Sequence, residues 1–543
     1  MTVIVISRRI ARWTIVKWSL VNRRIGGSGN PIALASALLL AFFVLPSAAD
    51  NGNSSKKENE TVITQQQARI GGKLVHYTAE VGRIAICDVE TGEPHGYMGY
   101  TAYRIASPTP RPVTFIWNGG PGADSTLLHF SVTGPKLADG VRLVDNPDSW
   151  LPASDLVTVD PIGTGFSRPV KAEYGAEFYG TLGDVASVTE FVRAWRLIHG
   201  AEQTPVFLAG ESWGAGRAAS VAYALEKRGI TVNGMVLISG GWALNKSYGS
   251  PALQTALRVV DMASAALYYG KTGYGKTNSG NASPDLEKDR TAVRQAAEKW
   301  VRESYAPALS RIAELSEAER TAIANQLSRI TGLSAEQIDH KTLTITPRQF
   351  RTGLLKDQNK EPYIFDLRRT SPPGKEDAPA ILNYFRHELG FHTTLPYIGL
   401  EEMEQGFAPA GTYPEPVNAR WNYATAKITP EELKAAMEDA SKRGDGPPRL
   451  GPPLPATEEA IALNPHIKVL VAAGMYDSFL PCATGSEIDR QLPANLRSAI
   501  TFKCYVGGHA MYLDAATRSE FSRDVEALIV GAQSFGAQRE TSK

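Results

Sequence analysis

The sequence predicts an α/β fold in which a mostly parallel sheet is covered by helices on both faces and is interrupted late by a long helical insertion. Short apolar or β-branched runs alternate with helical patterns, as the strands and covering helices of such a fold do. The stretch 245–464 breaks this alternation. The chain has 543 residues, of which 43% are hydrophobic, and this composition suits a large globular protein and excludes a disordered or collagen-like one.

The first 49 residues have the order of a secretory signal. A basic leader without acidic residues precedes an apolar run over 32–45 and small residues up to Ala49. This run of 14 residues falls short of the roughly 20 that a spanning helix needs, which favours a cleaved signal over a retained membrane anchor. We expect 1–49 to be a signal peptide, the protein to be periplasmic or secreted, and no stable membrane association after cleavage.

The segment after the signal starts with a polar stretch and continues with strands. Residues 50–69 are rich in Asn, Ser, Lys and Gln, which predicts a flexible linker. The runs 73–80, 83–89 and 97–105 are typical of strands and are separated by Gly and Pro signals, so an antiparallel start of the sheet is expected.

The parallel part of the sheet is predicted from runs that read as strands buried on both faces. Two helical patterns, 184–199 and 213–227, lie between some of them. The first part of the core is therefore placed at 70–244, the inserted helical cap at 245–464 and the second part of the core at 465–543; an independent second domain is the alternative for the insertion. The expected strands are 113–117, 156–160, 206–209, 232–239 and 468–473.

A candidate nucleophile lies in the pentapeptide Gly210-Glu211-Ser212-Trp213-Gly214. This G-x-S-x-G pattern follows an expected strand and precedes an expected helix, which is the setting of a nucleophile elbow. Small neighbours are needed because the serine backbone is strained in that sharp turn. The sequence therefore predicts Ser212 as the nucleophile, whereas a plain glycine turn with a surface serine is the alternative.

A serine hydroxyl needs a base, and the base needs an acid to orient it. Proteins with a nucleophile elbow place these residues in the chain order Ser, acid, His. His509 lies on a Gly-rich loop after the strand-like run 499–506, and Asp477 follows the end of the expected strand 468–473. These two residues are the predicted base and acid; Asp489 and Asp514 rank lower, since they lie on an expected helix or after the histidine.

A third element is the Gly-rich stretch Trp117-Asn118-Gly119-Gly120-Pro121-Gly122, directly after an expected strand. Glycines there let backbone N–H groups approach a substrate oxygen, so the loop is expected to supply half of an oxyanion hole, with the N–H of Trp213 as the other donor. A phosphate-binding loop is the rival interpretation, but the Lys-Ser/Thr ending of a P-loop is missing.

These stretches, together with Asp160-Pro161-Ile162-Gly163-Thr164-Gly165-Phe166-Ser167, resemble the serine carboxypeptidase family, peptidase family S10, in its bacterial form. The resemblance implies an α/β-hydrolase fold and an exported enzyme that removes C-terminal residues from peptides through an acyl-enzyme. Carried over by motif, it implies a triad of Ser212, Asp477 and His509 and oxyanion donors at Gly120 and Trp213. It also implies that Asn118 and Glu211 bind the free carboxylate of the substrate.

The proposed role of Glu211 makes physical sense. Two carboxylates repel each other, so a glutamate facing a C-terminal carboxylate must share a proton with it, and binding should weaken as the pH rises. A glutamate that only stabilises the elbow is the alternative. The family pattern is not complete, because Ala123 stands where many relatives have a cysteine that forms a disulfide.

The three cysteines allow at most one disulfide within the chain, and the sequence does not decide whether it forms. Export would place the chain in an oxidising compartment, where three cysteines cannot all pair within one chain. Cys87 is expected to be alone. Cys482 and Cys504 either form a disulfide or are small buried side chains.

Composition and spacing argue against several partners. The net charge of +1 and the lack of a long basic block give no reason to expect nucleic acid. His387 and His392 are five residues apart and would not share one helix face, so no metal is predicted, and no cofactor. An esterase or acyltransferase with the same triad, or a catalytically silent binding protein, remains the alternative to a carboxypeptidase acting on peptides with a free C-terminal carboxylate.

Overall fold

The computed structural model describes residues 61–540, apart from 241–242, 245–247, 274–284, 375, 402–415, 427, 444–449 and 452. The predicted signal peptide 1–49 and most of the predicted linker lie outside the described residues. In the described part of the chain, no helix is long and apolar enough to cross a membrane.

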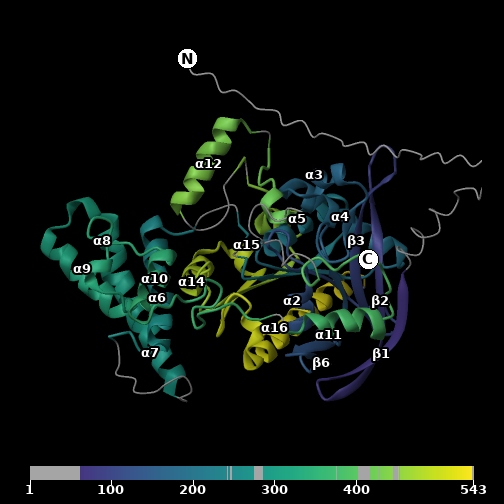
Figure 1. Cartoon of the computed structure of the whole chain (residues 1–543), viewed down its shortest axis with the longest axis horizontal. Coiled ribbons are helices and arrows are strands. Elements are labelled where there is room, and N and C mark those ends of the chain that lie inside the picture. Colours follow the sequence, from purple (N-terminus) through teal and green to yellow (C-terminus); the bar gives the residue numbers. More distant parts are fainter. Residues whose placement is uncertain are drawn as a thin grey trace, which may run out of the picture. The chain divides into compact units, whose positions relative to one another are not determined.

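A ten-stranded sheet forms the centre of the fold (Figure 1). Its order is β1-β2-β3-β7-β4-β9-β10-β11-β12, with β8 beside β3. The pairs from β1 to β7 are antiparallel, and every pair from β7 through β4 to β12 is parallel. The strands are β1 (Val62–Ile70), β2 (Lys73–Cys87), β3 (Pro94–Arg104), β4 (Val113–Trp117), β7 (Asp155–Val159), β8 (Arg168–Pro169), β9 (Val206–Glu211), β10 (Val232–Ile238), β11 (Lys468–Gly474) and β12 (Ile500–Tyr505), with β5 (Lys136–Asp139) and β6 (Arg142–Asp145) as a separate hairpin.

Helices cover both faces of the sheet, as the unbroken apolar strands predict. Successive residues of β4 illustrate this, because Phe115 packs among side chains of α4 (Thr181–Ile198) and α5 (Trp213–Lys227), whereas Ile116 packs on the side of α16 (Ala515–Glu540). The fold is the expected α/β-hydrolase fold. Shorter helices on the core are α2 (Thr126–Leu128), α3 (Gly175–Phe178), α14 (Cys482–Gln491) and α15 (Ala494–Arg497).

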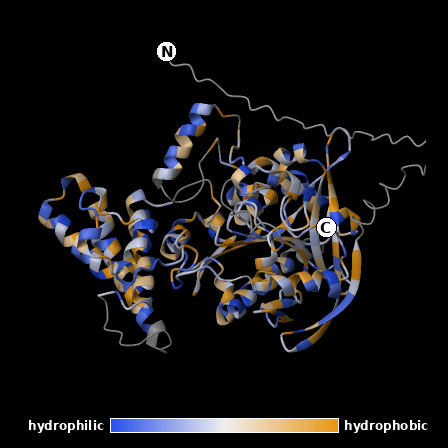
Figure 2. Ribbon diagram, in the orientation of Figure 1, coloured by the Kyte–Doolittle hydropathy of each residue, from blue (hydrophilic) through white to orange (hydrophobic). Residues whose placement is uncertain are grey.

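A long, mainly helical segment is inserted between β10 and β11. Helices α6 to α10 lie together in Figure 1 and share a hydrophobic core of their own. Their ribbons carry mixed hydrophobic and hydrophilic residues in Figure 2, as amphipathic helices do. The helices of the insertion are α6 (Pro251–Tyr268), α7 (Asp285–Trp300), α8 (Ala306–Ser310), α9 (Glu317–Thr331), α10 (Pro347–Leu354), α11 (Ala378–Asn383), α12 (Pro430–Arg443) and α13 (Thr457–Leu463).

Only part of the predicted cap 245–464 lies apart from the sheet. Tyr384, Phe385 and Tyr397 are buried in the same hydrophobic cluster as residues of the central strands. The aromatic content of this stretch explains the difference, because several large rings close together gain more from burial in the core than from exposure on a cap.

Two predictions about the N-terminal strands were wrong. Residues 62–69 of the predicted linker form β1, whose backbone pairs with β2 from Val62 to Ile70 while alternate Gln and other polar side chains point to solvent. The predicted break between 80 and 83 does not occur either. Gly82 continues β2 because its backbone pairs with Tyr100 of β3, and the glycine fits there because a Cβ would lie 2.7 Å from the Thr61 hydroxyl.

The structure decides the open question of the disulfide. Cys482, the first residue of α14, is bonded to Cys504 in β12, with their Cα atoms 5.6 Å apart. Cys87 is a free, exposed cysteine.

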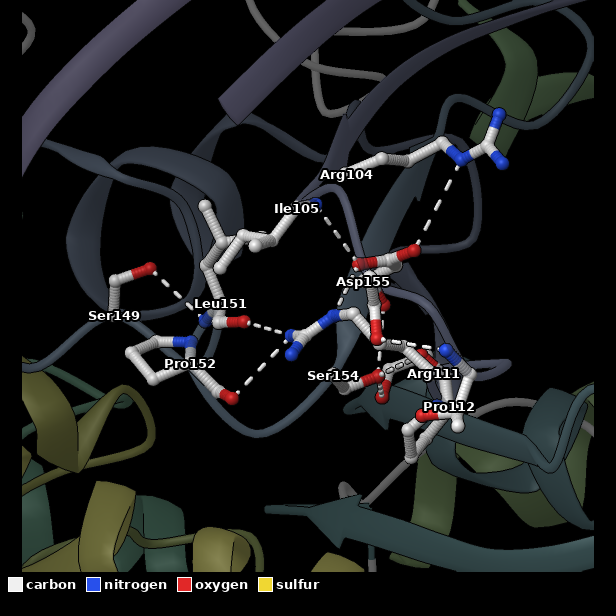
Figure 3. A network of polar contacts seen from close by, with 12 residues as sticks. Arg104, Ile105, Arg111, Pro112, Ser149, Leu151, Pro152, Ser154 and Asp155 are labelled. Carbon is white, nitrogen blue, oxygen red and sulfur yellow. Dashed lines mark hydrogen bonds and ion pairs between the residues drawn. The ribbon is translucent and has the colours of Figure 1, made fainter. Parts of the chain in front are cut away.

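A polar network holds the edge of the sheet where β4 and β7 begin (Figure 3). Asp155 accepts hydrogen bonds from Arg111 Nε (2.9 Å) and from the N–H of Ile105 (3.2 Å). Arg111 Nη2 in turn donates to the carbonyl of Leu151 (2.5 Å). This network stabilises loops at the amino ends of the parallel strands. Ligands of open α/β sheets bind at the opposite side, outside the carboxyl ends of the strands, where β9, β11 and β12 end.

Candidate active site

Ser212 lies in a sharp turn between β9 and α5. Its backbone has φ 57° and ψ −124°, a strained conformation for a residue with a side chain. The turn is possible only with glycine at the flanks, because a Cβ on Gly210 would lie 1.9 Å from the carbonyl oxygen of Gly214. The serine side chain is therefore presented half-buried at the N-terminus of α5.

Asp477 and His509 lie in the loops that follow the neighbouring parallel strands β11 and β12, and the structure brings them together. Asp477 Oδ2 and His509 Nδ1 are 2.7 Å apart, and both residues are buried. With Nδ1 donating to the carboxylate, the other ring nitrogen is left to accept a proton. His509 Nε2 has no hydrogen-bond partner among the described residues. Burial alone would lower the pKa of His509, but the Asp477 carboxylate outweighs it and raises that pKa.

The alternative acids serve other purposes. Asp489 lies on α14, and Asp514 forms an ion pair with Arg368 at 2.8 Å.

The Gly-rich loop after β4 packs directly against the elbow. A Cβ on Gly119 would lie 2.5 Å from the backbone nitrogen of Trp213. Gly120 has φ +101°, a conformation that favours glycine. The indole N–H of Trp117 donates to the carbonyl of Gly214 at 2.9 Å. The loop and the start of α5 therefore form one surface beside Ser212, with Gly120 and Trp213 in it.

Asn118 and Glu211 form a buried pair next to the nucleophile. Asn118 Nδ2 donates a hydrogen bond to Glu211 Oε2, and Tyr512 OH donates to the same oxygen at 2.8 Å. Asn118 is itself held by the N–H of Leu128, which donates to its side-chain oxygen at 3.0 Å. Arg217, paired with a buried aspartate, donates to the Asn118 carbonyl at 2.7 Å.

The second oxygen of Glu211 is the unusual atom of the site. Glu211 is 1% exposed, and its Oε1 has no hydrogen-bond partner among the described residues. Burial raises the pKa of Glu211 to about 7, against the opposing effect of His509. A buried carboxyl oxygen without a partner costs free energy, so this position is suited to a ligand that shares a proton with it.

The Asp160 motif supports the Gly-rich loop through hydrogen bonds that connect Asp160 to Asn118 by way of Ser125. Asp160 accepts hydrogen bonds from the N–H of Ser125 (2.9 Å) and from Tyr397 OH (2.8 Å), while the Ser125 hydroxyl accepts from the N–H of Asn118 (3.2 Å). Burial, together with the nearby Asp124 carboxylate, raises the pKa of Asp160 to about 7. This motif positions the site without lining it.

Several residues near the site carry no sequence signal. Tyr512 lies three residues after His509, and only the fold brings it to Glu211. The inserted segment contributes Trp421 and Tyr423, whose rings make edge contacts with Trp213 at 5.9 and 5.7 Å, and Phe365, whose ring is 5.0 Å from that of His509. Periodicity could not reveal them, because each contact joins positions far apart in the chain.

No arrangement of His, Cys, Asp and Glu in the described part of the chain is suited to hold a metal ion.

Comparisons with known proteins agree with the geometry. Residues 92–302 match the family model described as serine carboxypeptidase. The pheromone-processing carboxypeptidase kex1 of Aspergillus niger is 32% identical over 170 residues, which are 29% of this chain and 27% of that protein. The corresponding KEX1 of Verticillium alfalfae is 30% identical over 173 residues, 30% of this chain and 27% of that protein. The chain thus spans about a quarter of the length of the curated relatives that it matches.

Among solved structures, this chain aligns with a thermostable carboxyl esterase from Bacillus coagulans, at 13% identity and a TM-score of 0.32 over 83% of this chain and 98% of that chain. A haloalkane dehalogenase from Bradyrhizobium elkanii has 13% identity and a TM-score of 0.30 over 88% of this chain and 99% of that chain. By its family model and its two curated relatives, the segment 92–302, which contains the Gly-rich loop and the nucleophile elbow, belongs to the serine carboxypeptidase family, peptidase family S10.

Proposed function

We propose that the protein is an exported serine carboxypeptidase that hydrolyses the C-terminal peptide bond of peptides. The observation that carries the proposal is the buried Glu211, whose Oε1 is unpartnered among the described residues and which directly precedes the nucleophile. A carboxyl group at this position can share a proton with the free carboxylate of a peptide, which the substrate of a general esterase lacks.

The reaction follows from the roles of the three triad residues. Ser212 Oγ attacks the carbonyl carbon of the last peptide bond while His509 Nε2 takes the hydroxyl proton, and Asp477 stabilises the resulting imidazolium. The N–H groups of Gly120 and Trp213 stabilise the oxyanion. His509 then gives the proton to the leaving amine as the C–N bond breaks, which leaves an acyl-enzyme on Ser212. A water molecule deprotonated by His509 releases the shortened peptide.

The substrate carboxylate is held by Asn118 and Glu211. Oε2 of Glu211 already accepts from Asn118 and Tyr512, so Oε1 is the position that meets the substrate. The protonated Glu211 donates its O–H to the substrate carboxylate, and this hydrogen bond exists only while the pair holds a proton.

An N-blocked dipeptide and its C-terminal amide test the proposal, because both present the same scissile bond. At pH 5.5 we expect kcat/KM for the acid to exceed that for the amide by roughly 10- to 100-fold, since a hydrogen bond to a charged group contributes about 1.5–3 kcal/mol. Initial rates on both substrates give the ratio. Equal values, or hydrolysis of simple esters alone, would favour an esterase or acyltransferase instead.

Export is expected to follow from the N-terminal signal. The native protein should be recovered outside the cytoplasm with a mature N-terminus near Asp50, because Ser47 and Ala49 suit the signal peptidase. N-terminal sequencing of the purified native protein measures this. A chain that still begins with Met1 and fractionates with membranes would instead indicate a retained anchor.

A further inference from the structure

Residues 363–369 of the inserted segment, called here the strap, cross the two loops that carry Asp477 and His509. The strap is a tight turn of its own, closed by a hydrogen bond from the N–H of Tyr363 to the carbonyl of Arg369 at 2.7 Å. It lies more than a hundred residues before the loops it touches, so its contacts with them are tertiary contacts.

The strap binds the acid loop on both sides of Asp477. The N–H of Leu367 donates to the carbonyl of Tyr476 at 2.9 Å, and the hydroxyl of Ser478 donates to the carbonyl of Ile364 at 2.6 Å. The residues before and after the catalytic acid are therefore both fixed to one short segment.

The same segment binds the base loop. The backbone N–H of His509 donates to the carbonyl of Phe365 at 2.6 Å, and the ring of Phe365 lies 5.0 Å from the imidazole. This approach requires Gly508, because a Cβ there would lie 2.4 Å from the same Phe365 oxygen. Arg368 adds an ion pair of 2.8 Å to Asp514, beyond the histidine.

Arg368 also braces the strap itself. Its guanidinium makes two hydrogen bonds to the Asp366 carboxylate, at 2.9 and 2.7 Å, and lies 5.0 Å above the ring of Tyr476. Burial alone would lower the pKa of Arg368, but the carboxylates of Asp366 and Asp514 raise it, so the side chain stays charged. One cation thus connects the strap, the acid loop and the segment after the base.

We propose that the strap is a positioning element that fixes the acid and the base relative to each other, with Arg368 of the strap and Ser478 of the acid loop as the key side chains. The inference rests on the proposed function, since it assigns the acid and base roles to Asp477 and His509. Two loops that follow neighbouring strands could otherwise move independently, and a displacement of about 1 Å in a catalytic group can cost about a hundredfold in rate.

Arg368→Gln and Ser478→Ala test the proposal. We expect each to lower kcat about tenfold or more with KM within a factor of two, because the strap contacts the acid and base loops and not Asn118 or Glu211, which we place against the substrate carboxylate. Arg368→Lys, which keeps the charge, and Ser478→Thr, which keeps the hydroxyl, should recover most of the loss. The matched control is Arg351→Gln, which removes a 2.8 Å ion pair to Glu361 in the same inserted segment; Arg351 is 16% exposed and Arg368 18%.

A second readout separates positioning from stability and from the proposed activity. A proton shared between His509 Nδ1 and Asp477 should give a low-field NMR resonance, assigned by its loss in His509→Gln. We expect this resonance to shift or broaden in Arg368→Gln and Ser478→Ala but not in Arg351→Gln, and the labelling rate of Ser212 by a fluorophosphonate to fall in parallel. Both measurements work even if peptides are not the substrate.

The proposal is overturned if Arg368→Gln and Ser478→Ala both match the Arg351→Gln control in kcat, resonance and labelling rate. It is also overturned if the variants lose kcat and labelling rate only because they unfold at a lower temperature, so that both values are normal when measured well below that temperature. If the resonance and the labelling rate respond as expected while no peptide is cleaved by the unmodified protein, the strap stands and the proposed function fails.

Discussion

Ser212→Ala is expected to lower kcat for peptide hydrolysis by about 10⁶-fold, because without the hydroxyl no acyl-enzyme can form. The fold should survive the change. Ser212 is half-buried, and its side chain makes no hydrogen bond that caps α5. Alanine has to adopt the same strained φ of 57° as serine, so the free energy of unfolding should change by less than about 0.5 kcal/mol.

Active-site labelling provides the direct measurement. A fluorophosphonate should modify Ser212 in the unaltered protein, as located by mass spectrometry of the digested protein, and nothing in Ser212→Ala. Ser310→Ala is a suitable control, since it removes an exposed serine hydroxyl from α8 and should keep both full labelling and full activity. Full peptidase activity in Ser212→Ala, or labelling of another residue, would disprove the assignment of the nucleophile.

The parallel part of the sheet could be predicted because each strand carries its own local signal. A strand buried on both faces must be apolar over most of its length, and β4, β9, β10 and β11 each carry only one polar or charged residue. The loops of Asn118, Ser212 and Asp477 follow such strands, and the loop of His509 follows β12, the strand at the end of the sheet order. Parallel strands end at the same edge of a sheet, so the sequence order alone predicted that these loops would meet.

The parts that could not be predicted depend on tertiary contacts. The stretch 62–69 lacks an apolar strand pattern, and it becomes β1 only because β2 offers a free edge with a matching register. The disulfide needed the 5.6 Å separation of two Cα atoms, which depends on how α14 packs beside β12. Likewise, Tyr512 and Phe365 acquire their positions from the packing of distant segments, and neither periodicity nor spacing records such contacts.

The pH dependence of kcat/KM is expected to separate substrates with a free carboxylate from those without one. Burial raises the pKa of Glu211 to about 7, so Glu211 is protonated below that pH and can donate to a substrate carboxylate. Above it, two carboxylates face each other, and kcat/KM for an N-blocked dipeptide should fall about tenfold per pH unit, or roughly 100-fold at pH 9. The C-terminal amide brings no charge and should show no such decline.

The acidic limb should be common to all substrates. His509 must be neutral to accept the serine proton, and its raised pKa means that this form is lost as the pH falls. A decline on the acidic side for acid and amide alike therefore reports on His509, whereas a decline on the alkaline side for the acid alone reports on Glu211.

Glu211→Gln isolates the alkaline effect. Asn118 and Tyr512 both donate to Oε2, so the carbonyl oxygen of a glutamine should take that place and its NH₂ group should take the place of Oε1, facing the substrate. The variant then donates a hydrogen bond at every pH, and the alkaline decline for the dipeptide acid should disappear while the amide profile stays unchanged. The measurement is kcat/KM from pH 4 to 9 for both substrates in both proteins.

Glu80→Gln is the matched control, because Glu80, like Glu211, is a buried glutamate that accepts a hydrogen bond from a tyrosine, here Tyr100. Glu80 lies on β2, where its other partner is His199, and it touches none of the proposed catalytic residues. It should keep the alkaline decline of the unaltered protein. The acid and amide substrates could instead share one pH profile that Glu211→Gln leaves unchanged. Glu211 would then not bind the substrate carboxylate, and it would be a residue that stabilises the elbow. A decline that moves equally in Glu80→Gln and Glu211→Gln would point to a general loss of stability, because only Glu211 is proposed to meet the substrate carboxylate.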